Sequence, residues 1–160
     1  MTIEKIIKKL IKKKITLSVA ESCTGGMIAS EITSVPNSSS IFNLGLITYS
    51  NKSKETILKV KKNSLNKYGA VSAQVCKNML EGLFKISKTN LCISTTGIAG
   101  PGGSTKSKPV GLVYVGIKLN KISKIFMFNF DKKLSRKKIQ KATVKNVFKK
   151  IDQIIWFLLK

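Results

Sequence analysis

Histidine is absent from this sequence of 160 residues, and arginine occurs once, at Arg136. Without histidine a serine–histidine–aspartate triad cannot form, and the usual set of zinc ligands is incomplete. The three cysteines (Cys23, Cys76 and Cys92) are widely spaced with no CxxC pair, so we expect reduced thiols rather than a disulfide framework or a metal site. Hydrolytic chemistry would need another base, and we predict no metal or other cofactor.

Long apolar runs are also missing. No stretch approaches the ~18 uninterrupted apolar residues of a membrane span. The N-terminal sequence MTIEKIIKKLIKKKI has lysines where a signal peptide has its apolar block. We therefore predict a cytoplasmic protein with no membrane partner.

Acidic residues are few, and the net charge is +23, from 30 Lys and Arg against 7 Asp and Glu. Such a charge raises the possibility of nucleic-acid binding, which would show as strongly salt-dependent affinity. However, every basic residue except Arg136 is a lysine, spread from Lys5 to Lys160, and aromatic residues make up 7%. Readers of bases depend on arginine forks and stacking aromatics. The composition therefore argues against a nucleic-acid partner.

The apolar content of 42% suffices for one core, so residues 1–160 are predicted to form a single domain. Apolar periodicity predicts alternating helices and strands that end in a hairpin around Asn120. The predicted helices are 3–11, 23–32, 52–59, 72–86 and 134–159, and the predicted strands are 15–21, 42–50, 91–97, 112–119 and 123–130. Suitable N-caps for three of the helices are Ser22 or Thr24, Ser50 or Asn51, and Ser72. This order is typical of an α/β fold: a three-layer α/β/α sandwich with a mixed, mainly parallel sheet.

In such sheets ligands bind at the carboxyl ends of the parallel strands, so the loops AESCTGG, TYSN and TTGIAGPGG should converge. The first places backbone N–H groups at a helix start, which suits an anion, although an ordinary capped turn would look the same. The loop TTGIAGPGG has the GxxxxG spacing of a P-loop at Gly97 and Gly102. Gly103 and Ser104 follow where a P-loop has lysine and a hydroxyl residue. It is therefore either a backbone loop shaped for a ligand or a plain surface loop.

Lys54 is the candidate base because of its position. It is predicted in the first turn of helix 52–59, where the positive end of the dipole lowers an amine pKa. A lysine with a pKa near 10.4 needs a shift of about three units, or ~4 kcal/mol, to act as a base at neutral pH. The dipole supplies about 1 kcal/mol, so desolvation and neighbouring cations must supply the rest. The alternative is an ordinary surface lysine.

The motifs AESCTGG, GLITYSNKSK, YGAVS, TTGIAGPGG and KPVG, in this order, resemble the CinA C-terminal domain family. The resemblance covers about Thr16 to Ile154. The stand-alone members of this family look like nicotinamide-nucleotide amidases, which hydrolyse nicotinamide mononucleotide to nicotinate mononucleotide and ammonia by a serine and lysine mechanism. The resemblance implies a small nucleotide as substrate and a role in recycling pyridine nucleotides.

By position, the resemblance implies Ser39 in NSSS as the nucleophile, with Ser38 as the fallback, and Lys54 as the base. Tyr49 and Ser22 would be supporting hydroxyls. The residues implied in holding the ribose phosphate and an oxyanion are Thr24, Gly25, Gly26, Gly97, Gly100, Gly102, Gly103 and Arg136.

Two positions depart from the family pattern. Asn37 stands where glycine usually precedes the serine pair, and LSR, ending at Arg136, stands where Gly-Asp-Arg is usual. Asparagine tolerates a left-handed backbone, so the first departure should be accommodated. The rival hypothesis is a catalytically inactive nucleotide-binding or competence- and damage-related regulatory protein on the same fold. The apolar terminal helices make a homodimer a further expectation.

Overall fold

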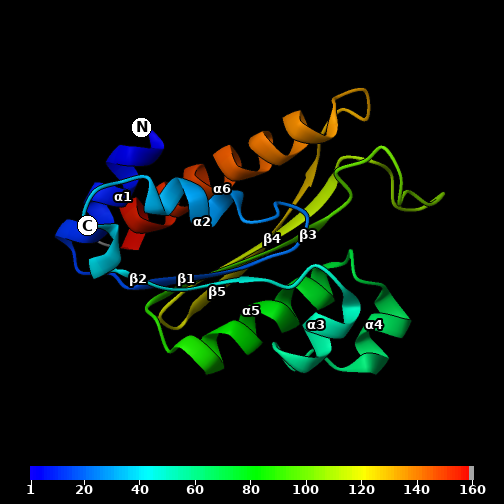
Figure 1. The fold of residues 1–160 in the computed structure, drawn as a ribbon, viewed down its shortest axis with the longest axis horizontal. Helices are drawn as coiled ribbons and strands as arrows, with labels where there is room; N and C mark the ends of the chain where they lie inside the picture. The colour runs from blue at the N-terminus through cyan, green and yellow to red at the C-terminus, as the bar shows by residue number, and fades with distance from the viewer. Residues whose placement is uncertain (159–160) are drawn as a thin grey trace.

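A five-stranded sheet lies between two layers of helices in the computed structural model, which describes residues 1–158 (Figure 1). The strand order is β2-β1-β3-β4-β5, and the strands are β1 (Leu17–Glu21), β2 (Phe42–Ile47), β3 (Leu91–Gly97), β4 (Leu112–Leu119) and β5 (Ile122–Asn129). β1 pairs in parallel with β2 and β3, whereas the β3–β4 and β4–β5 pairs are antiparallel. Only β4 runs against the other strands, which confirms the predicted mixed, mainly parallel sheet.

The helices are divided between the two faces of the sheet (Figure 1). One face carries α1 (Ile3–Lys12), α2 (Met27–Thr33) and α6 (Arg136–Leu158), and the other carries α3 (Asn51–Thr56), α4 (Lys62–Tyr68) and α5 (Ala73–Ser87). A short 3-10 helix, η1 (Ser38–Ser40), precedes β2. The predicted three-layer α/β/α sandwich is therefore confirmed. None of the helices within residues 1–158 has the length and apolarity required to cross a bilayer.

β1 shows how one strand serves two cores. Leu17 and Val19 belong to the apolar cluster under α1, α2 and α6, whereas Ala20 belongs to the cluster under α4 and α5. Because successive side chains point to opposite faces, a strand covered on both sides must be apolar or satisfied at every position. Ser18 meets this requirement by hydrogen bonds to Ser87 and Thr89 at 2.8 Å each.

Local signals located most helices correctly. Ser50 and Ser72 cap α3 and α5, accepting the N–H of Ser53 at 3.0 Å and of Val75 at 3.2 Å. The turn between β4 and β5 has Asn120 at φ 52°, a left-handed conformation that asparagine tolerates. The predicted last residue of α6, Leu159, lies outside the described residues.

Two predictions about helices were wrong. α2 begins at Met27 and not after Ser22 or Thr24, because residues 22–26 form a turn, and neither side chain caps the helix. The Glu21 carboxylate accepts the N–H groups at the start of α2 instead. Helix α4 was missed altogether: it has no side-chain N-cap and buries a single residue, Leu65, so its apolar period is weak.

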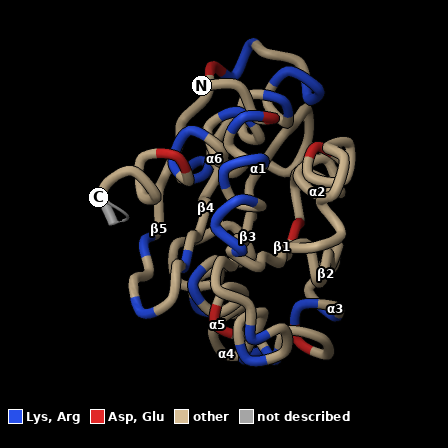
Figure 2. Tube along the Cα trace, turned by 90° about the vertical axis from the view of Figure 1, so that its left-hand side faces the viewer, with Lys and Arg blue, Asp and Glu red and all other residues tan. Residues whose placement is uncertain are grey.

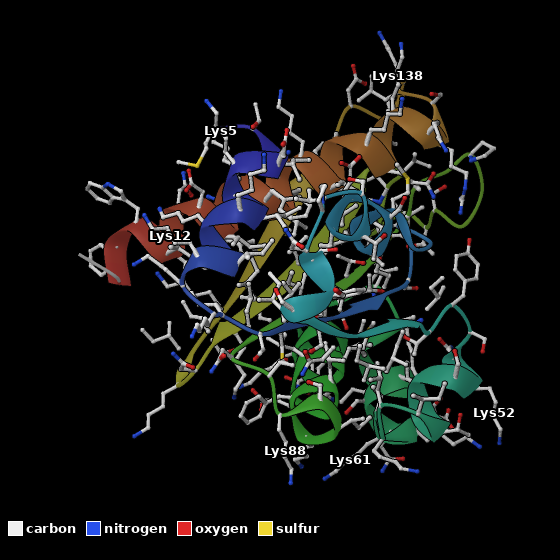
Figure 3. The ribbon with its side chains drawn as sticks, turned by 60° about the vertical axis from the view of Figure 1, so that its left-hand side comes forward. Lys5, Lys12, Lys52, Lys61, Lys88 and Lys138 are labelled. Atoms are coloured by element: carbon white, nitrogen blue, oxygen red, sulfur yellow. The ribbon has the colours of Figure 1, made fainter. Side chains whose placement is uncertain are left out.

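The basic residues are dispersed. Blue segments occur in both helical layers in Figure 2. The lysines labelled in Figure 3 (Lys5, Lys12, Lys52, Lys61, Lys88 and Lys138) are exposed and lie on separate sides of the molecule. Lys54 differs from all of these because its exposed fraction is 1%.

Candidate active site

Three loops at the carboxyl ends of β1, β2 and β3 meet around one cavity, as the topology predicts. This end of the sheet lies opposite the two chain termini (Figure 1). The cavity has a volume of about 260 Å³ and is lined by Ser22, Cys23, Tyr49, Lys54, Ala70, Val71, Thr96, Gly97, Ile98, Ala99, Gly102, Gly103 and Arg136. This volume is near the lower end for small-molecule sites, roughly 300 Å³.

The Lys54 amine is held against Ser22 in the floor of this cavity. Its Nζ lies 3.1 Å from Ser22 Oγ, 2.8 Å from the carbonyl oxygen of Thr48 and 3.3 Å from that of Tyr49. Ser22 is 8% exposed and Lys54 1%. The two side chains come from positions 32 apart in the sequence.

The Lys54 amine can make these three contacts in either protonation state. A neutral amine has two N–H groups and one lone pair, whereas an ammonium has three N–H groups and accepts nothing. As an ammonium, Lys54 donates to both carbonyl oxygens and to Ser22 Oγ. As a neutral amine that donates to both carbonyl oxygens, it has its lone pair left for the Ser22 hydroxyl, and this form is placed to remove the hydroxyl proton.

Burial lowers the pKa of Lys54 below its ordinary value of 10.5, because desolvation disfavours the ammonium; the neighbouring Cys23 acts in the opposite direction. Desolvation was one of the contributions predicted for this shift, but the predicted contribution of a helix dipole is wrong. Lys54 lies in the last turn of the six-residue α3, where a dipole would favour the charged form. The predicted direction of the pKa shift agrees with the structure, and its cause is desolvation.

Ser22 sits on a turn that is bonded at several points. Its N–H donates to the carbonyl of Thr95 at 3.1 Å, and the hydroxyls of Thr24 and Thr95 are 2.9 Å apart. The carbonyl of Cys23 accepts from the Gln140 amide at 2.9 Å. A side chain on such a turn is held in one orientation, which suits a reacting hydroxyl.

The structure does not bring Ser39 or Ser38 to Lys54, so the predicted nucleophile needs correction. Both serines are in η1, before β2, whereas Lys54 follows β2. Six strand residues at about 3.3 Å each separate the two ends by roughly 20 Å. Ser39 is exposed, Ser38 is buried, and neither lines the cavity. The hydroxyl beside the amine belongs to Ser22, which the sequence comparison had given a supporting role.

Arg136 ties two of the loops together from the start of α6. Its Nη1 donates to the carbonyl of Gly100 at 2.8 Å, and its Nη2 donates to the Tyr49 hydroxyl at 2.6 Å. Tyr49 is 58% exposed at the mouth of the cavity. Tyr49 and Arg136, which were predicted for different roles, therefore lie in one site, and Gly100 takes part through its carbonyl.

The predicted glycine contacts divide into two groups. Gly97, Gly102 and Gly103 line the cavity, and the N–H groups of Gly102 and Gly103 have no acceptor among residues 1–158. By contrast, the N–H of Gly25 donates to the Ser22 carbonyl at 3.1 Å and that of Gly26 to Glu21 at 3.0 Å.

Gly25, Gly26 and Thr24 are thus committed to internal bonds, and none of them lines the cavity. Their prediction as substrate contacts is not supported, because the Glu21 carboxylate already accepts the N–H groups at the start of α2.

Several lining residues were missed from the sequence. Ala70 and Val71 come from the loop between α4 and α5, and the Ala70 carbonyl accepts from the Thr96 hydroxyl at 2.8 Å. The YGAVS motif that contains them was the available signal, since it matched the family pattern without a role. Cys23 also lines the cavity, but burial raises the pKa of its thiol to about 12. It is therefore protonated and a poor nucleophile.

In the part of the chain that the structure describes, no three His, Cys, Asp or Glu side chains are grouped to hold a metal ion. The cavity polar groups are hydroxyls, one buried amine, a guanidinium and backbone N–H groups. Their chemistry suits an anionic ligand and a nucleophilic hydroxyl.

The sequence profile of the CinA C-terminal domain matches residues 1–155. Similar curated proteins are named "putative competence-damage inducible protein". One from Clostridium perfringens is 48% identical over 148 residues, covering 92% of this chain and 35% of the relative. Another, from Thermoanaerobacter pseudethanolicus, is 49% identical over 141 residues, covering 88% of this chain and 34% of the relative. The chain thus spans about a third of the length of these relatives.

Solved structures have the same fold. A competence/damage inducible protein from Agrobacterium tumefaciens superposes with a TM-score of 0.89 at 34% identity, covering 94% of each chain. A CinA superfamily protein from Escherichia coli also gives 0.89, at 27% identity, covering 96% of this chain and 90% of that one.

Proposed function

Since this chain belongs to the CinA C-terminal domain family, we propose that it is an amide hydrolase that acts on nicotinamide mononucleotide, with Ser22 as nucleophile and Lys54 as base. The observation that carries this proposal is the 3.1 Å contact between Ser22 Oγ and a buried Lys54 Nζ beside the cavity. A buried amine of lowered pKa does here what histidine does in other serine hydrolases.

The proposed reaction has two steps. Lys54 takes the Ser22 proton as Ser22 Oγ attacks the carboxamide carbon, and the tetrahedral intermediate collapses when Lys54 returns the proton to the departing nitrogen, which leaves as ammonia. A water molecule, deprotonated by Lys54, then attacks the ester on Ser22. This step releases the carboxylate product and regenerates the hydroxyl.

The rest of the cavity suits the nucleotide. Arg136 presents a guanidinium that can bind phosphate through two parallel N–H groups, which lysine cannot do. Gly102 and Gly103, which line the same cavity, add N–H groups that have no acceptor among residues 1–158. The N–H of Cys23, directly after Ser22, is our candidate for stabilising the oxyanion.

The test is ammonia release from nicotinamide mononucleotide by the wild type, Lys54→Met and Lys52→Met. Both lysines lie on α3, but Lys52 is exposed and its side chain extends outward from the molecule (Figure 3), and it does not line the cavity. We expect Lys54→Met to lose about 10²- to 10⁴-fold in kcat, as removal of a general base does. Lys52→Met should keep the wild-type rate. Binding of the nucleotide without any ammonia release at pH 6 to 10 would favour the rival hypothesis, a regulatory nucleotide-binding protein.

A further inference from the structure

Glu21 is a buried carboxylate with no lysine partner in a chain that has 30 basic residues. It ends β1, its exposed fraction is 1%, and the three ion pairs found within residues 1–158 do not include it. A buried charge normally needs a charged partner or several hydrogen bonds. Because Glu21 has no charged partner among these ion pairs, hydrogen bonds must stabilise its buried carboxylate.

Its partners are three backbone N–H groups at the far end of the Ser22 turn. Oε2 accepts from Gly26 at 3.0 Å and from Ile28 at 3.2 Å, and Oε1 accepts from Ala29 at 2.9 Å. Residues 22–25 lie between the Glu21 backbone and these N–H groups, so one residue holds both ends of the turn.

We propose that Glu21 is a positioning residue for the reaction proposed above: its carboxylate fixes the turn that carries Ser22 and so holds Ser22 Oγ against Lys54 Nζ. This inference rests on the proposed roles of Ser22 and Lys54. Glu21 does not line the cavity, so it acts on the reaction through Ser22 and not through the substrate.

The same bonds keep the carboxylate from acting as a counter-ion to Lys54. The Glu21 carbonyl accepts from the Thr48 N–H at 2.9 Å, and the Thr48 carbonyl accepts from Lys54, so the two residues belong to one neighbourhood. A free carboxylate there would favour the ammonium form of Lys54. Three N–H groups stabilise the negative charge at the start of α2 instead.

The test uses Glu21→Gln, with Glu31→Gln as the matched control. Glu31 is a half-buried residue of α2, the helix whose first N–H groups Glu21 accepts, and the Glu31 carboxylate accepts no hydrogen bond in the described chain. In Glu21→Gln the amide oxygen can keep two bonds, but the NH₂ group faces the N–H of Ala29. The resulting shift of the turn should lower kcat by about 10- to 100-fold, as small misplacements of reacting groups do. KM should change by less than about twofold, because uniform substrate binding is untouched.

The pH profile separates positioning from charge. We expect the acid limb of kcat/KM, which reports the free enzyme's base, to stay in place in Glu21→Gln. If the limb moved to lower pH while the maximal rate stayed at the wild-type level, Glu21 would act by its charge and the inference would be overturned. A wild-type kcat in folded Glu21→Gln would also overturn it.

Glu21→Asp keeps the charge but is one methylene shorter, and it serves if Glu21→Gln fails to fold. We expect a similar loss of kcat, because the shorter side chain cannot keep all three hydrogen bonds to the N–H groups. Full activity would contradict the proposal that these bonds position Ser22.

A second readout is the rate at which Ser22 reacts with a fluorophosphonate, in which Oγ attacks phosphorus and fluoride leaves. We expect Glu21→Gln to label about 10-fold or more slowly than Glu31→Gln. Labelling of wild-type Ser22 without ammonia release would reject the proposed substrate and still test Glu21. Equal labelling rates in both variants would reject the role of Glu21 alone.

Discussion

Replacing Lys54 with methionine should change how the stability of the fold depends on pH. In the folded protein burial lowers the pKa of Lys54 below 10.5, whereas the unfolded chain keeps the ordinary value. Between the two pKa values the unfolded chain holds one more proton than the native state, so the wild-type free energy of unfolding rises with pH. The slope is about 1.4 kcal/mol per pH unit. Methionine does not titrate and removes this slope.

If Lys54 is neutral at pH 7.5, the wild type should gain about 2 kcal/mol relative to Lys54→Met between pH 7.5 and 9. Urea unfolding of both proteins across this range, followed by circular dichroism, measures the difference. The range stops at pH 9 because burial raises the pKa of Cys23 and Cys76 from 9.0 to about 12, which makes stability fall above that pH. A difference that stays constant with pH would refute a neutral, buried Lys54.

Three further predictions concern binding, packing and reactivity. Arg136→Lys should raise KM about tenfold with a smaller change in kcat, measured by steady-state ammonia release, because one ammonium cannot replace the fork; an unchanged KM would contradict this. Gly82→Ala should destabilise the fold by about 1–3 kcal/mol or more in urea unfolding, because its Cβ would lie 2.0 Å from the Leu58 carbonyl oxygen; wild-type stability would contradict that packing. Cys23, with a pKa of about 12, should resist iodoacetamide at pH 8 in the native protein, as mass spectrometry can check; rapid labelling would contradict its burial.

The fold was predictable because its signals are local and repeated. β1 lies in a stretch that alternates apolar and polar residues, β3 begins with the apolar residues Leu91, Cys92 and Ile93, and a topology rule then places their carboxyl-end loops together. That rule correctly predicted that the segment before Lys54 and the glycine-rich loop after β3 would meet at one site. It also excludes the segment before β2, so the choice of Ser39 conflicted with a topology already predicted. The position of NSSS at the amino end of β2 was the unused signal.

The remaining errors concern contacts that no spacing encodes. The carboxylate that caps α2 comes from Glu21, outside the helix, and it displaced the expected cap at Ser22 or Thr24. The dipole contribution expected for Lys54 failed because the residue lies in the last turn of α3, and its pKa is lowered by burial, the desolvation that was also expected. Such effects follow from tertiary packing, which the local pattern of residues does not specify.

Ammonia release by Ser22→Ala and Ser39→Ala, compared with the wild type on nicotinamide mononucleotide, tests the central claim most directly. Ser39 is exposed and Ser22 contacts Lys54, so the two variants remove the same atom from the two candidate positions. We predict that Ser22→Ala loses release to the background rate and that Ser39→Ala stays within about twofold of the wild type. Full activity in Ser22→Ala together with loss in Ser39→Ala would contradict the proposed pair of Ser22 and Lys54.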